Sequence, residues 1–160
     1  MRLDQSGQLL RIDQKNSTFL LMRSEEQEPV VLPFQEETRF VDGAGNPQSP
    51  GELVGKKVNV SCETKKVYAV MEHSGEVPHC FVLEEIRKQP DGMWLCIFQN
   101  GRLEVTVVSD AEVRPYQTRN IVRMGDLKAG DEVIVYYDAI TLSEPARTWT
   151  KKIVLLKTAE

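Results

Sequence analysis

The sequence predicts an all-β protein made of two small barrels in tandem. Short runs rich in β-branched and aromatic residues recur along the chain, each bounded by Gly, Pro, Asn or Asp, and helical periodicity is hard to find. The second half of the chain also repeats the order of strands and turns of the first half. This internal repeat predicts two similar units.

The first half is expected to consist of short strands joined by polar turns. Residues 57–62 alternate strictly, with Val58, Val60 and Cys62 on one face, as a half-buried strand requires. Glycines and an Asn-Pro pair in residues 42–47 supply turn geometry. The expected strands are residues 8–13, 19–22, 30–32, 38–41, 57–62, 67–71 and 79–86.

The second half contains the clearest hairpin signal. Apolar runs at residues 94–98 and 103–108 flank Asn100-Gly101, a dipeptide that favours a tight turn between strands. This hairpin corresponds to residues 19–32 of the first half. The remaining correspondences are 112–114 with 38–40, 126–133 with 52–58, 134–137 with 59–62, and 152–156 with 80–83.

The run from His79 to Arg87 matches both the closing strand of the chain and its opening strand at residues 8–13. We therefore expect the two units to share this run. No Gly/Ser-rich linker lies between the halves, which predicts a stiff pair with domains at residues 1–86 and 87–160.

The stretch Thr106–Val113, followed by Gly125–Tyr137, resembles a group of small, mostly uncharacterised bacterial OB-like β-barrel domains. In that group a strand ending in Ser-Asp precedes a variable loop, a short Asp-Leu-Lys-x-Gly-Asp turn and a further strand. The resemblance extends faintly into the first half, where Lys56 and Lys57 replace the acidic residue after the glycine. It implies the fold, here in tandem duplication, and carries over no catalytic residue. Several members of the group belong to exported or envelope-associated proteins of Gram-positive bacteria.

Together these features predict two OB-like or SH3-like barrels packed together, each of about five or six strands. Single turns of helix are expected near residues 50–54 and 124–128. The alternative is one larger β-sandwich or barrel in which the two halves exchange strands. The repeat alone does not decide between these architectures.

Composition and charge limit the kinds of partner and the cellular location that we expect for the protein. A hydrophobic fraction of 41% and a charged fraction of 28% are typical of a globular protein, and a net charge of −4 gives no long-range attraction for nucleic acid. No apolar run is long enough to span a membrane, and no signal-peptide core follows Met1. We expect a cytoplasmic protein without membrane insertion. The alternative is an exported or envelope-associated protein whose signal has been removed.

Metal and nucleophile chemistry is not expected. A zinc site would have to gather His73, His79, Cys80 and Cys62, but no Cys-x-x-Cys or His-x-x-x-His pair supports it. His79 and Cys80 are adjacent on a predicted strand and therefore point to opposite faces, so the imidazole cannot easily take a proton from the thiol. The three cysteines are interpreted as buried small hydrophobes, and no cofactor is expected.

Paired carboxylates offer little better support for an enzyme. Most fall in turns, where solvation explains them, and adjacent glutamates on a strand diverge. The sequence therefore predicts no catalytic residue, and a hydrolase would need two carboxylates to converge in a cleft. The glutamates considered are Glu25, Glu26, Glu28, Glu36, Glu37, Glu84 and Glu85.

A binding face is the favoured hypothesis, because OB-like barrels present aromatic side chains for bases or sugars to stack on. The candidate ligand-binding residues are Tyr116, Tyr136, Arg147 and Trp149. Residues Ala139–Thr150 are polar and contain a proline, which predicts a mobile or binding loop rather than a strand. Core packing, or a lid over the barrel end, is the competing interpretation of the aromatic residues.

The function predicted is a non-catalytic binding or interaction module that contacts a protein or polysaccharide through the loops Ala139–Thr150 and Asp42–Gly51. The chain is expected to be a monomer or an edge-strand dimer. The alternative is a single-stranded nucleic-acid-binding protein, which would need a local basic groove. That groove would be formed by Lys65, Lys66, Arg114, Arg119, Arg123 and Arg147.

Overall fold

The computed structural model describes residues 3–116 and 122–159, and the chain divides into two compact units, Met1–Gly75 (unit 1) and Glu76–Glu160 (unit 2). Each unit contains one six-stranded sheet, and no α-helix occurs in the described residues. The all-β class and the two units are therefore confirmed. Each sheet draws its strands from one unit, so the alternative of a single sandwich or barrel with exchanged strands is wrong.

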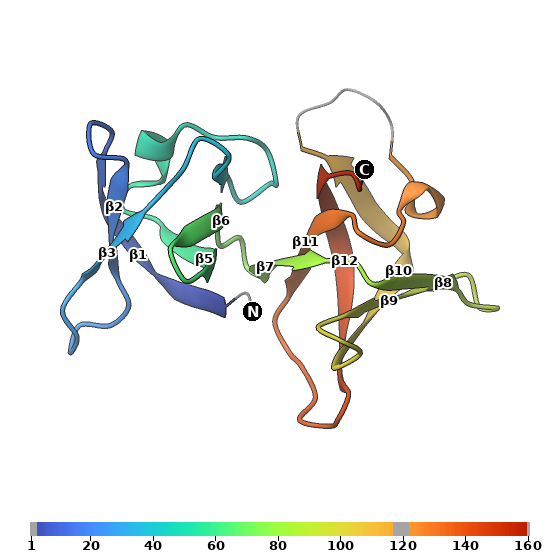
Figure 1. Cartoon of the computed structure of the whole chain (residues 1–160). Helices are drawn as coiled ribbons and strands as arrows, with labels where there is room; N and C mark the ends of the chain where they lie inside the picture. Colours follow the sequence, from blue (N-terminus) through green and yellow to red (C-terminus); the bar gives the residue numbers. More distant parts are fainter. Residues whose placement is uncertain (1–2, 117–121, 160) are drawn as a thin grey trace. The chain divides into compact units, whose positions relative to one another are not determined.

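Unit 1 is a mixed sheet with the strand order β3-β2-β1-β5-β6-β4 (Figure 1). All its strand pairs are antiparallel except β4 and β6, which are parallel. Its elements are β1 (Leu3–Asp13), β2 (Thr18–Met22), β3 (Val30–Pro33), β4 (Arg39–Val41), the 3₁₀ turn η1 (Pro50–Leu53), β5 (Lys57–Glu63) and β6 (Lys66–Glu72).

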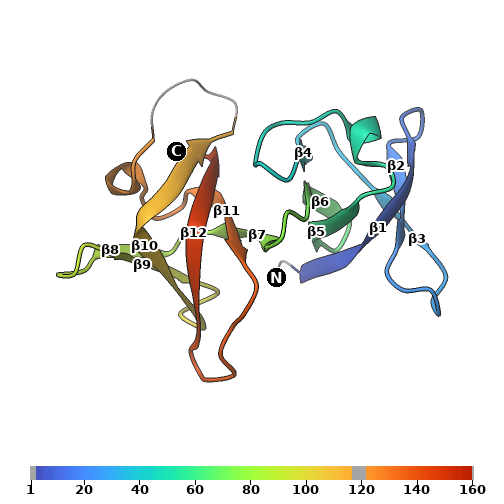
Figure 2. The ribbon, with the colours of Figure 1, turned by 180° about the vertical axis from the view of Figure 1, so that it is seen from behind.

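Unit 2 has the order β7-β11-β12-β10-β9-β8, and Figure 2 shows its long strands β10 and β12 side by side. These two strands are parallel and the other pairs are antiparallel. The elements are β7 (Val77–Val82), β8 (Glu85–Lys88), β9 (Trp94–Phe98), β10 (Leu103–Pro115), η2 (Met124–Asp126), β11 (Glu132–Tyr137) and β12 (Ala146–Lys157).

The internal repeat is present in the strand pairing. In unit 1 the first half of β1 pairs with β5 and the second half with β2. In unit 2 the corresponding pairings are made by two separate strands, β7 with β11 and β8 with β9. Conversely, the single strand β10 of unit 2 pairs with both β9 and β12. In unit 1 two strands make these pairings: β3 pairs with β2, and β4 pairs with β6. The two units therefore share one connectivity.

Two details of the expected repeat need correction. The His79–Arg87 run corresponds to the opening strand β1 and lies in unit 2, because β7 pairs with β11. It is not shared between the units, and the boundary lies between Gly75 and Glu76 rather than after residue 86. The closing strand β12 therefore corresponds to β6, not to residues 80–83.

Neither sheet closes into a barrel, in contrast to the expectation of closed barrels. The outermost strands, β3 and β4 in unit 1 and β7 and β8 in unit 2, are not paired with each other. Between β7 and β8 the backbone of Leu83 bonds to the turn before β11: its N–H donates to the carbonyl of Asp131 at 2.8 Å. The core of each unit lies on the inner face of its open sheet.

In unit 1 a buried leucine and a glycine turn are joined by two backbone hydrogen bonds. The N–H of Leu9 donates to the carbonyl of Lys56 at 3.0 Å, and the N–H of Gly55 donates to the carbonyl of Leu9 at 2.7 Å. Gly55 has a φ of 87°, a conformation that glycine adopts without strain. The register of β1 against β2 shifts between Leu9 and Arg11, just after the pairing of β1 with β5 ends at Gln8.

Unit 2 makes the same pair of bonds with Leu83. The N–H of Gly130 donates to the carbonyl of Leu83 at 2.7 Å, and Gly130 has a φ of 94°. The fully buried carboxylate of Asp131 fixes this turn by accepting the N–H of Lys128 at 2.9 Å and that of Ala159 at 2.8 Å. The last two residues of the Asp-Leu-Lys-Ala-Gly-Asp sequence thus have structural roles: Gly130 donates a hydrogen bond to Leu83, and Asp131 accepts two that hold the turn.

Replacing Gly130 by alanine is expected to lower the free energy of unfolding of unit 2 by about 1 to 3 kcal/mol. The new Cβ would lie 2.8 Å from Cβ of Ala159, on a backbone with positive φ. Both tryptophans, Trp94 and Trp149, lie in unit 2, so urea unfolding followed by tryptophan fluorescence reports on this unit. Gly125→Ala is the control, because its nearest neighbour would be 3.9 Å away. Equal unfolding midpoints for the two variants would contradict the prediction.

Candidate functional site

The beginning of β12 exposes alternate side chains to solvent. Arg147 and Trp149 are exposed, the latter by 59%, whereas Thr148 and Thr150 are buried. The two threonine hydroxyls donate to the backbone carbonyls of Ala139 and Tyr136, which removes the cost of burying them. The predicted loop Ala139–Thr150 therefore ends at Pro145, and the remaining residues are a strand whose inner positions carry threonines.

Trp149 belongs to a face that extends across four strands. Strand register aligns Arg87, Leu95, Thr106 and Trp149 in one row, and the next row lies two residues away on each strand. Paired residues project to the same side of a sheet, so the two rows form one surface. We call this surface the Trp149 face: Glu85, Arg87, Leu95, Ile97, Glu104, Thr106, Arg147 and Trp149.

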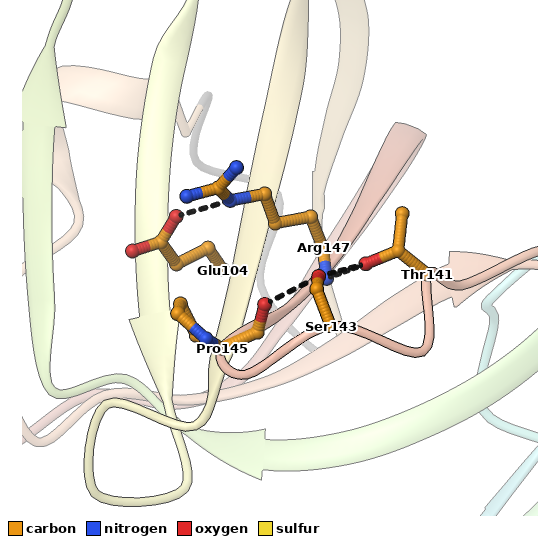
Figure 3. Close-up of polar contacts among 5 residues, drawn as sticks. All are labelled: Glu104, Thr141, Ser143, Pro145 and Arg147. Atoms are coloured by element: carbon orange, nitrogen blue, oxygen red, sulfur yellow. Dashed lines mark hydrogen bonds and ion pairs between the residues drawn. The ribbon is translucent and has the colours of Figure 1, made fainter.

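The charges of the Trp149 face are paired and sum to zero. Arg147 Nε lies 3.2 Å from Glu104 Oε1 (Figure 3), and Arg87 Nε forms an ion pair with Glu85 Oε2. Both arginines are exposed, and such surface pairs typically add only about 0 to 1 kcal/mol to stability. Two arginines and two glutamates thus present fixed donors and acceptors without a net charge.

The β11–β12 connection, residues 138–145, is a structured loop beside this face. Thr141 and Arg147 exchange two hydrogen bonds: Thr141 N–H donates to the carbonyl of Arg147, and the N–H of Arg147 donates to Thr141 Oγ1, both at 2.9 Å. Ser143 Oγ donates to the carbonyl of Pro145 at 2.8 Å (Figure 3). The loop nevertheless exposes Ile140 by 41% and Leu142 fully.

The structure brings together two of the four predicted ligand-binding residues. Arg147 and Trp149 share the Trp149 face, but Tyr136 is buried, with Lys152 Nζ 4.7 Å from its ring centroid. Tyr116 is half-buried, and its N–H donates to the carbonyl of Leu155 at 3.0 Å. Leu155 is six residues beyond Trp149, about 20 Å along the strand.

Two of the basic residues proposed as a groove, Arg114 and Arg147, lie far apart along the sheet of unit 2. Arg114 pairs in register with Val154, seven residues beyond Arg147 on β12, about 23 Å away. Arg114 also forms an ion pair with Glu112 at 3.4 Å. Lys65 and Lys66 are in unit 1, Arg123 precedes η2, and Arg119 lies outside the described residues.

The histidines and cysteines considered as metal ligands are engaged elsewhere. The His79 ring stacks on Tyr137 at a centroid distance of 4.2 Å, whereas Cys80 Sγ donates to Glu132 at 3.6 Å. Cys62 and His73 lie in unit 1. Within residues 3–116 and 122–159, no group of three or more His, Cys, Asp or Glu side chains is arranged to hold a metal ion.

Two carboxylates, those of Glu84 and Asp42, accept backbone N–H groups in turns. The Glu84 carboxylate accepts the N–H groups of Asn100 and Gly101, and it therefore fixes the predicted β9–β10 turn. In the loop at residues 42–51, Asp42 Oδ1 accepts the N–H groups of Ala44 and Asn46, each at 2.9 Å.

Comparison with protein-family models and with curated proteins finds no match for this chain. The described part of the chain contains no helix of the length and apolarity needed to cross a membrane. The function must therefore be argued from the Trp149 face itself.

Burial raises the pKa of the Cys96 thiol from its ordinary 9.0 to about 12. The folded chain keeps this thiol neutral where the unfolded chain ionises it. The free energy of unfolding is therefore expected to fall by about 1 kcal/mol per pH unit as the pH rises from 9 towards 12. Urea unfolding of the wild type and of Cys96→Ala at pH 8, 9 and 10 tests this. Cys96→Ala should not show the part of this decrease that comes from the thiol. If the free energies of unfolding of the two proteins fell in parallel with pH, the raised pKa of Cys96 would be contradicted.

Proposed function

We propose that the protein is a non-catalytic binding module and that unit 2 binds a neutral polysaccharide on the Trp149 face. The observation that carries the proposal is the 59% exposed indole of Trp149 beside charge-paired side chains. The exposed part of the Trp149 side chain offers a large apolar surface for stacking, which packing in the core does not explain.

The chemistry of the face fits a sugar chain. The indole can stack on the apolar face of a pyranose ring, while Arg147 donates and Glu104 accepts hydrogen bonds at the ring hydroxyls. Leu95 and Thr106 lie between Arg87 and the indole in one row of the register. Four strands span about 14 Å, which suits a short stretch of polymer rather than a single small molecule.

The connectivity supports an OB-type unit. In unit 2 the opening strand is represented by β7 and β8, then come β9 and β10, the η2 turn, β11 and β12, with β10 parallel to β12. OB folds bind oligonucleotides and oligosaccharides on the face of their second and third strands. Here those strands are β9 and β10, which form the centre of the Trp149 face. A polysaccharide ligand would agree with the alternative of an exported or envelope-associated protein rather than with the expected cytoplasmic location.

A second candidate ligand is a protein, which the exposed Ile140 and Leu142 on the adjacent loop favour. The nucleic-acid alternative has less support. The Trp149 face has no net positive charge, so release of counterions from a phosphate backbone would contribute little to binding.

Trp149→Ala is expected to raise the dissociation constant for a bound oligosaccharide at least about tenfold, or 1.4 kcal/mol. Isothermal titration with cellohexaose, xylohexaose, chitohexaose and mannohexaose measures this. Trp94→Phe is the matched control, because Trp94 packs against the core rather than on the face. Raising NaCl from about 50 to 200 mM should leave the wild-type affinity nearly unchanged, whereas nucleic-acid binding would weaken strongly.

Three outcomes would overturn the proposal. Binding of none of the four hexaoses would remove the polysaccharide ligand, and capture of a protein that depends on Leu142 would then favour the second candidate. Equal affinities for the wild type and Trp149→Ala would show that the oligosaccharide does not bind on the Trp149 face. Tight, salt-sensitive binding of single-stranded DNA or RNA would establish the nucleic-acid alternative.

A further inference from the structure

The leucines that bond to the glycine turns align the opening strands of the two units residue by residue. Counting from Leu9 and from Leu83, Ile12 corresponds to Ile86, and both isoleucines pack against the core of their unit. Because side chains alternate along a strand, the residues on either side of these isoleucines project outward.

An oppositely charged pair occupies the same two outward positions in both units. Arg11 and Asp13 in unit 1 correspond to Glu85 and Arg87 in unit 2, with the order of the charges reversed. In unit 1, a hydrogen bond from the side chain of Asn16 is the largest cause that lowers the pKa of Asp13, so this carboxylate stays ionised. Each opening strand therefore presents one donor and one acceptor group at no net charge.

Strand register extends the correspondence to the neighbouring strands. Arg11 pairs with Leu20 and Leu20 with Val31, as Glu85 pairs with Ile97 and Ile97 with Glu104. The second row, Asp13, Thr18 and Pro33, corresponds to Arg87, Leu95 and Thr106. The outer face of β1, β2 and β3 is thus the counterpart of the part of the Trp149 face that lies on β8, β9 and β10, whereas β12, which carries Arg147 and Trp149, has no counterpart beside β3.

This counterpart face carries a shallow, open depression of about 40 Å³. Its hollow is lined by Arg11, Asp13, Thr18, Phe19, Leu20 and Val31. Val31 is 64% exposed at its edge, so apolar surface lies open beside the charged pair.

We infer that unit 1 holds a second binding site for the same class of ligand, a neutral oligosaccharide, in this hollow on β1, β2 and β3. The inference rests on the proposed function of the Trp149 face. Leu20 and Val31 supply the apolar contact that Trp149 supplies in unit 2, and Arg11 and Asp13 bind hydroxyl groups. Without an aromatic ring the unit 1 site is the weaker of the two.

Two-dimensional ¹⁵N NMR of the full chain, titrated with the same four hexaoses, tests the second site directly. The expected result is two separate sets of shifted amides, one around Leu20 and Val31 and one around Leu95 and Thr106, with two hexaoses bound per chain at saturation. In Trp149→Ala the second set should require at least about tenfold more hexaose to reach half of its shift, and the first set should titrate as in the wild type.

Val31→Glu should abolish the set around Leu20 and leave the affinity of the Trp149 face unchanged. Val54→Glu is the matched control, because Val54 is also an exposed valine of unit 1 but does not line the hollow. Its titration should match that of the wild type, with two hexaoses bound.

The possible failures are distinguishable. Shifts confined to unit 2, with one hexaose per chain, would overturn the second site and leave the proposed function intact. Shifts confined to unit 1 would overturn the Trp149 face, and no shifts with any hexaose would overturn both.

Discussion

The fold of each unit depends on the two backbone hydrogen bonds between a buried leucine and a glycine turn. Leu9 and Leu83 lie just past the end of the pairing with β5 and with β11, so their backbone N–H and C=O groups on that side bond to the turn that precedes the partner strand. The turns at Gly55 and Gly130 supply both partners, and their positive φ brings the backbone into place. Because these bonds use the backbone, units with different side chains keep the same connectivity.

Features set by neighbouring residues could be predicted from the sequence. The Asn100-Gly101 turn, with positive φ at both residues, and the single turns η1 and η2 occur where local composition indicated them. The role of residues 79–87 could not be predicted, because a closing and an opening strand have the same apolar pattern. The pairing of β7 with β11 and the bonds of Leu83 to the turn before β11, both with residues far along the chain, identify this run as the opening strand.

The candidate site could be predicted only in part. Arg147 and Trp149 were recognisable as candidate binding residues from the chemistry of their side chains, but the stretch that carries them resembled a loop because its inward positions are Thr148 and Thr150. Buried threonines satisfied by backbone carbonyls hide the alternation that marks a strand. The other side chains of the Trp149 face come from three further strands, and their alignment depends on register that no local pattern specifies.

The open sheets give the two units different points of local weakness. In unit 1 the outermost strands of the sheet are β3 and β4, which together correspond to β10 of unit 2. In unit 2 the outermost strands are β7 and β8, which together correspond to β1 of unit 1. Strands with a ladder on one side only are the first to exchange their amide protons with solvent. Two units of one connectivity therefore open locally at different strands. Unit 1 opens first at β3 and β4, and unit 2 opens first at β7 and β8.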